Sequence, residues 1–148
     1  MSKDKKIKIK NIVLASDHAG FKLKEVIKKY LKNKRKKVLD LGTNSLKPVD
    51  YPDLAHRLSR KMKKNSQLGI LICGSGIGMD ITANRHKNIR AALCYNPTIA
   101  RLSRKHNNAN VLGIGARLTK KNVALKCVNT FIKTNFEGGR HLRRLKKI

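Results

Sequence analysis

The chain has 148 residues, 40% of them hydrophobic, which suffices for one domain (1–148) with one buried core and leaves no room for a second. Its 36 Lys and Arg residues outnumber its 8 Asp and Glu residues, which gives a formal net charge of +28. No apolar run approaches the ~18 residues of a membrane span, and no signal peptide pattern follows the basic extension 1–8, so we expect a cytoplasmic protein with no membrane partner.

The high positive charge has two interpretations. It could attract a nucleic acid, or it could lie on the solvated outer faces of amphipathic helices. Aromatic residues make up only 4% of the chain and Trp is absent, so few side chains are present on which bases could stack. We therefore expect no nucleic-acid partner.

Short apolar runs alternate with helical patterns along the chain, which predicts a parallel sheet covered by helices on both faces. Each predicted strand is followed by a loop and a helix. The predicted strands are Ile12–Ser16, Lys37–Leu41, Leu68–Cys73, Ala91–Cys94 and Val111–Gly115. The predicted long helices are Phe21–Asn33, about Asp53–Lys64, Pro97 to about His106, and about Lys120–Thr134, followed by a basic tail at 136–148. The first of these helices is expected to place its apolar side chains on one stripe and its lysines on the other.

Ligands bind beyond the carboxyl ends of the strands in open parallel sheets, so the residues that follow each strand are the first candidates for a site. Asp17 and His18 directly follow the first strand. Asp17 could cap the next helix or bind a substrate, and the adjacent titratable His18 favours a site.

Cys73 begins the glycine-rich segment CGSGIG, which follows the most apolar strand. The segment lacks the Lys of the phosphate-binding loop and the glycine spacing of the dinucleotide fingerprint, so we expect no nucleotide cofactor. Its N–H groups could hold an anion and favour a thiolate, so Cys73 could act as nucleophile or base. The cysteine number is odd, and Cys94 and Cys127 lie in apolar stretches without CxxC spacing, so neither disulfides nor a metal site is predicted.

A third group of candidates lies at the end of the helix predicted from Pro97 and beyond the last strand. His106 and Asn107 close that helix just before the last strand, and we expect them at the same loop-rich edge as Cys73. Arg117 lies just beyond the last strand, and Arg140 and Arg144 share one face of the tail if the tail is helical. Guanidinium groups bind phosphate in a bidentate manner.

Taken together, these segments resemble the type B ribose-5-phosphate isomerases, whose family also contains the subunits of galactose-6-phosphate isomerase. The matching segments are SDHAGFKLK at Ser16–Lys24, DLGT at Asp40–Thr43, VDYPD at Val49–Asp53, ILICGSGIGM at Ile70–Met79, ITANRHKNIRAA at Ile81–Ala92, ARLSRKHNNANVLGIGAR at Ala100–Arg117 and FEGGRH at Phe136–His141. They occur in order over nearly the whole chain, which makes the resemblance specific.

The resemblance implies a three-layer α/β/α Rossmann-like sandwich and metal-free, cofactor-free interconversion of ribose 5-phosphate and ribulose 5-phosphate through a cis-enediolate. It implies that Cys73 is the proton-transferring base and His106 the group that opens the sugar ring. It also implies an oxyanion hole, with the hydroxyl of Ser75, made by Gly74, Ser75, Gly76, Ile77 and Gly78.

The remaining implied roles concern substrate binding and assembly. Asp17, His18 and Asn107 would bind the sugar, and Arg117, Arg140 and Arg144 would bind the phosphate. The tail would reach the site of a neighbouring subunit in a homodimer or homotetramer. Two alternatives stay open: an isomerase of a six-carbon sugar phosphate, and a basic nucleic-acid-binding module with a vestigial site.

Overall fold

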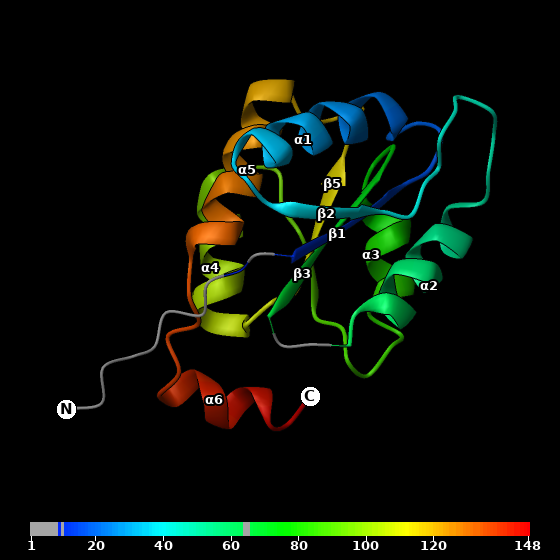
Figure 1. Cartoon of the computed structure of the whole chain (residues 1–148). Helices are drawn as coiled ribbons and strands as arrows, with labels where there is room; N and C mark the ends of the chain where they lie inside the picture. Colours follow the sequence, from blue (N-terminus) through cyan, green and yellow to red (C-terminus); the bar gives the residue numbers. More distant parts are fainter. Residues whose placement is uncertain (1–8, 10, 64–65) are drawn as a thin grey trace.

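A computed structural model describes residues 9, 11–63 and 66–148, so the basic extension predicted at 1–8 lies outside the described residues. Strands and helices alternate along the described chain (Figure 1). The strands are β1 (Asn11–Ser16), β2 (Lys37–Asp40), β3 (Gln67–Cys73), β4 (Ala91–Leu93) and β5 (Val111–Gly115). The helices are α1 (Phe21–Asn33), α2 (Tyr51–Lys61), α3 (Ile77–Ala83), α4 (Pro97–Asn107), α5 (Lys121–Lys133) and α6 (Arg140–Leu145).

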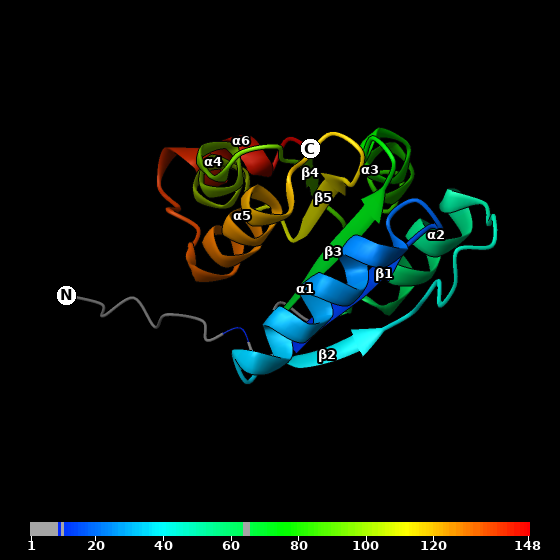
Figure 2. The same cartoon turned by 90° about the horizontal axis from the view of Figure 1, so that it is seen from above.

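The strands form one sheet in the order β2-β1-β3-β5-β4, and every pairing is parallel. Alternate residues of the central strands enter two separate cores, as the period of two in a strand requires. Ile70 and Ile72 of β3 pack toward α1, α4 and α5, whereas Leu71 and Cys73 pack toward α2 and α3. Figures 1 and 2 show these helices on the two sides of the sheet, which confirms the predicted three-layer α/β/α fold.

Two helices differ from their predicted positions. Helix α2 begins at Tyr51 rather than Asp53, because Pro52 fits the first turn, where its missing N–H costs no hydrogen bond. Helix α3 begins at Ile77, so Ile77 and Gly78 belong to a helix rather than to the loop after β3. Among the described residues, no helix has the length and apolar character that crossing a membrane requires.

Lys24 contradicts the expectation that the lysines of α1 face solvent, because it is 0% exposed. Its Nζ donates to Asp40 Oδ2 at 2.6 Å and to Glu25 Oε1 at 2.9 Å. Lys28 Nζ donates to the same two oxygens, at 2.8 and 2.9 Å. Burial alone would raise the pKa of Asp40, but the hydrogen bonds from Lys24, Lys28 and the Gly42 N–H lower it below its ordinary value. This network joins α1 to the end of β2.

We predict that Lys24→Ala lowers the free energy of unfolding by about 3 kcal/mol, because it removes one partner of a buried ion pair. Lys28→Ala is the matched control: it removes a partly exposed lysine from the same two acceptors and should cost less than about 1 kcal/mol. Urea unfolding of both variants measures the difference. Equal small losses would show that the buried position of Lys24 adds no stability.

Candidate active site

The carboxyl ends of β1, β3 and β5 lie next to one another, since β3 pairs in register with both neighbours. Hydrogen bonds between backbone groups also hold together the segments that follow these strands. The Asp17 N–H donates to the Ile72 carbonyl at 3.1 Å, and the Ala116 N–H donates to the Cys73 carbonyl at 2.8 Å. Residues from three segments far apart in the sequence therefore meet at the edge where open parallel sheets bind ligands.

Asp17 and His18 are both held by backbone groups. Asp17 is buried, and its Oδ1 accepts a hydrogen bond from the Gly20 N–H at 3.0 Å, which closes the turn before α1; the N-cap residue of α1 is Gly20 itself. His18 Nδ1 accepts from the Val49 N–H at 3.2 Å. A neutral His18 ring therefore carries its proton on Nε2 and can donate it to an oxygen of a ligand.

Cys73 is the last residue of β3, and its sulfur faces the turn that leads into α3. The Gly76 N–H donates to Cys73 Sγ at 3.1 Å, so a backbone dipole can stabilise negative charge on the sulfur. Ser75 Oγ accepts from the Ile77 N–H at 3.2 Å. Gly76 has φ +80°, a conformation that favours glycine. The turn is therefore a tight loop with the thiol at its start and two of its N–H groups bonded to Cys73 Sγ and Ser75 Oγ.

Glycines let the backbones at this edge come unusually close. A Cβ on Gly115 at the end of β5 would collide with the Ser75 carbonyl, and one on Gly76 would lie 2.9 Å from the Gly115 nitrogen. A Cβ on Gly20 would collide with the Ile72 carbonyl. The end of β3 and the loop after it therefore pack directly against the backbone of the turn after β1 and of the end of β5.

Arg117 and Tyr51 complete this edge. The Arg117 N–H donates to the Gly74 carbonyl at 3.0 Å, and its guanidinium lies over Gly74, where a Cβ would be 3.1 Å from Nη1. Tyr51 packs over Gly78, where a Cβ would be 2.9 Å from the phenol oxygen. Tyr51 received no role from the sequence, because only the fold brings the start of α2 against α3.

His106 and Asn107 do not lie beside Cys73 in this chain, so that expectation was wrong. They end α4 at the amino edge of the sheet, where Asn110 O accepts from the Gly69 N–H at 2.8 Å near the start of β3. The length of β5, five residues at about 3.3 Å each, separates the two edges. A residue that precedes a parallel strand lies at the opposite edge from residues that follow one.

Arg140 and Arg144 of α6 also lie away from Cys73. Helix α6 packs against α4, and the ring of His141 stacks on the ring of His106 with centroids 4.3 Å apart. In Figure 1 the arrowheads of β3 and β5 point away from α6. Burial, and then the electrostatic influence of the neighbouring His106 and Arg140, lower the pKa of His141 from its ordinary value. The predicted site residues therefore form two groups at opposite edges of the sheet.

Asp80 is a feature that sequence reasoning missed, because it stands between two of the family-like segments and belongs to neither. It lies in the first turn of α3, and a Cβ on Gly113 of β5 would be 2.6 Å from its Oδ1. Burial raises the pKa of Asp80 to about 6, against a smaller opposite effect of a hydrogen bond from the backbone of Leu93. Within the described part of the chain, Oδ1 has no hydrogen-bond partner.

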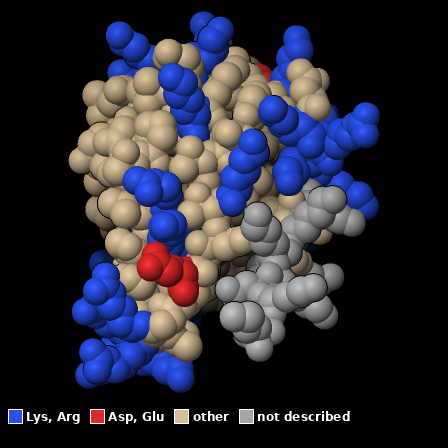
Figure 3. All heavy atoms as spheres, turned by 90° about the vertical axis from the view of Figure 1, so that its left-hand side faces the viewer, with Lys and Arg blue, Asp and Glu red and all other residues tan. Residues whose placement is uncertain are grey.

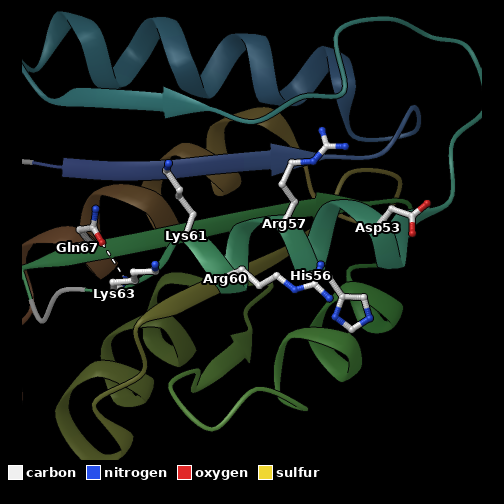
Figure 4. A pocket seen from close by; sticks show the side chains of 7 residues that line it. All are labelled: Asp53, His56, Arg57, Arg60, Lys61, Lys63 and Gln67. Carbon is white, nitrogen blue, oxygen red and sulfur yellow. Dashed lines mark hydrogen bonds between the residues drawn. The ribbon is translucent and has the colours of Figure 1, made fainter.

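A surface hollow of about 690 Å³ lies elsewhere, along α2 (Figure 4). It contains none of the predicted site residues and is lined by Asp53, His56, Arg57, Arg60, Lys61, Lys63 and Gln67. Four cations and one carboxylate line it, so it is one place where the positive charge of the chain is concentrated.

The chain matches the family described as Ribose/Galactose Isomerase over residues 12–148, and it therefore belongs to this family. Its structure superimposes on a ribose 5-phosphate isomerase from Thermotoga maritima with a TM-score of 0.90 at 51% identity, covering 93% of this chain and 95% of that one. It superimposes on ribose-5-phosphate isomerase B from Mycoplasma genitalium, solved with bound ribulose-5-phosphate, with a TM-score of 0.89 at 48% identity and coverages of 93% and 92%. Ribose-5-phosphate isomerase B of Escherichia coli is 39% identical over 141 residues, 95% of each chain.

We predict that Asp80→Asn stabilises the protein in a pH-dependent way. The pKa of Asp80 in the folded state lies above the ordinary 3.8, so folding favours the protonated carboxyl. As the pH rises from about 4 to above 6, the carboxyl becomes charged and the free energy of unfolding falls. Replacement by the neutral amide should therefore add on the order of 1–2 kcal/mol at pH 7.5, allowing for partial exposure, and little at pH 4.

Urea unfolding at the two pH values measures the effect, with Asp53→Asn on the exposed surface as the control. A loss of stability for Asp80→Asn at pH 7.5, or a gain that is equal at both pH values, would contradict the assignment.

Proposed function

We propose that this chain is an aldose–ketose isomerase that interconverts D-ribose 5-phosphate and D-ribulose 5-phosphate, a reaction of the non-oxidative pentose phosphate pathway. The observation that carries the proposal is the Cys73 sulfur at the carboxyl edge of β3, in contact with a loop N–H. Family membership and the names of the close relatives support the same reaction. The bound ribulose-5-phosphate of the Mycoplasma genitalium structure supports the substrate class.

The proposed chemistry is a proton transfer between adjacent carbons. The Cys73 thiolate removes the proton from C2 of the open-chain aldose while the C1 carbonyl oxygen gains negative charge, which gives a cis-enediolate. The same thiol then returns the proton to C1, and a proton moves between the two oxygens, so that the carbonyl finally lies at C2. N–H groups of the segment Gly74–Gly78, which forms the loop and the start of α3, stabilise the oxyanion together with the hydroxyl of Ser75.

The carboxyl edge supplies further substrate contacts. Asp17 and the Nε2–H of His18 would bond sugar hydroxyls or the ring oxygen, and hydrogen bonds from backbone N–H groups that hold both side chains just beyond β1 support this role. Arg117, whose guanidinium lies over Gly74, offers a charged donor for the phosphate.

We further propose that the site is completed by a second copy of the chain. His106, Asn107, Arg140 and Arg144 sit at the amino edge of their own sheet, so they can serve Cys73 only in a neighbouring subunit. Exposed apolar side chains suit such a contact: Ile77 and Ile81 of α3 are 50% and 57% exposed, and Tyr95 and Leu118, which follow β4 and β5, are 63% and 73% exposed. His106 of the second copy would then open the furanose ring, and the tail arginines would bind the phosphate.

We predict that wild-type protein equilibrates the two pentose phosphates and that Cys73→Ala lowers kcat by at least about 100-fold, as expected when a catalytic base is removed. The matched control is Cys94→Ala. Burial raises the pKa of the Cys94 thiol to about 12, so this cysteine stays protonated and its replacement should leave kcat unchanged.

The assay should include D-ribose 5-phosphate and six-carbon aldose phosphates. Activity only on a six-carbon substrate would refute the assignment of a pentose phosphate as the substrate but would leave the proton-transfer mechanism unchanged. Full activity in Cys73→Ala would refute the proposed base.

A further inference from the structure

His106, Glu137 and His141 form a group of side chains with the composition of a metal site. His106 ends α4, Glu137 lies in the connection between α5 and α6, and His141 lies in the first turn of α6. One ligand atom of each lies within 4.8 Å of the others. Two imidazoles and one carboxylate are a donor set that suits Zn²⁺.

The three side chains are close enough to share an ion, but one ring must reorient to bind it. Zinc–ligand distances of about 2.0–2.1 Å in a tetrahedral site put ligand atoms about 3.3 Å apart, so these atoms would have to approach by about 1.5 Å at most. The two imidazole rings are now nearly parallel, at 14°. Because a metal lies in the plane of each ring that binds it, binding would tilt the half-buried ring of His106 away from the stack.

One nitrogen of the group is buried and lacks a hydrogen-bond partner among the described residues. His141 is only 6% exposed, and its Nε2 has no hydrogen-bond partner among the residues the structure describes. Buried polar atoms are nearly always paired, so an orphan imidazole nitrogen beside a second histidine and a carboxylate indicates a missing ligand.

Basic side chains near His106, Glu137 and His141 are expected to weaken the binding of a metal ion. Lys105 Nζ lies 3.9 Å from Glu137 Oε2, and Arg140 and Arg144 carry charge close to His141. Figure 3 shows the face that carries α4 and α5, with an acidic patch close to a dense group of basic side chains. These charges oppose a divalent cation, and three protein ligands leave one position open to water, so an exchangeable ion is expected rather than a structural one.

We propose that His106, Glu137 and His141 bind one exchangeable Zn²⁺ per chain. Bound zinc occupies a nitrogen of His106 and thereby prevents this residue from transferring a proton. The inhibitory consequence rests on the proposed function, in which His106 opens the sugar ring, whereas zinc binding itself does not.

Titration of the full-length protein with CoCl₂ tests the site directly, because the visible absorption of Co²⁺ becomes strong when the ion is bound in a four- or five-coordinate site. Wild-type protein should bind one ion per chain, and ZnCl₂ should displace it. Glu137→Gln and His141→Asn should each weaken binding at least about tenfold, as the loss of one ligand requires. Cys73→Ala should bind as tightly as the wild type, which excludes a thiolate ligand.

The matched control is His56→Asn, which disrupts the second histidine pair of the chain. His56 Nδ1 and His86 Nε2 are 2.7 Å apart, and no third ligand residue joins them among the described residues. Unchanged binding in this variant supports the proposal. Equal affinities in wild type, Glu137→Gln and His141→Asn, or loss of binding in His56→Asn alone, would overturn it.

An activity measurement separates this proposal from the proposed function. ZnCl₂ should inhibit the wild-type isomerase, EDTA should restore it, and Glu137→Gln should be active and at least about tenfold less sensitive to zinc. Cobalt binding by a protein that isomerises no sugar phosphate would support the metal site and refute the function. An active isomerase that binds no cobalt would support the proposed function and refute the metal site.

Discussion

The close contact between the loop after β3 and the end of β5 is the constraint on which the candidate site depends. No side chain fits between the Ser75 carbonyl and Gly115, so the loop lies directly on the backbone of β5. This position brings the Gly76 N–H to the Cys73 sulfur and puts Gly74 under the guanidinium of Arg117. The parallel sheet therefore does more than support the loop, because its central strands determine where the thiol, the N–H donors and the Arg117 guanidinium converge.

The acidic and the basic side chains of the chain play different parts in the structure. Three of the acids take part in specific contacts: Asp40 pairs with the buried Lys24, Asp17 accepts a hydrogen bond in the turn after β1, and Asp80 is half-buried against β5. Most of the cations lie outside the sandwich, for example in the hollow along α2. The net charge of +28 thus affects how the protein meets other molecules more than how it folds.

Local patterns were sufficient to predict the five strands and their parallel arrangement. Local patterns failed to predict the position or burial of a residue where these depend on the direction of a strand or on contacts with residues distant in the sequence. The sequence distance from His106 to the last strand is short, but the direction of that strand puts His106 at the opposite edge from Cys73. Lys24 fits the polar stripe of a helix, and only its contact with Asp40 of β2 explains its burial. The stack of His141 on His106 likewise needs α6 to return to α4.

The central claim is that one working site takes Cys73 from one chain and His106 from another. It is tested most directly by mixing Cys73→Ala and His106→Asn chains, through co-expression or joint refolding. If the site is shared within a dimer, half of the dimers contain both variants, and each of these has one intact site of two, which gives about a quarter of wild-type activity. A mixture no more active than the better of the two parent variants would contradict the account.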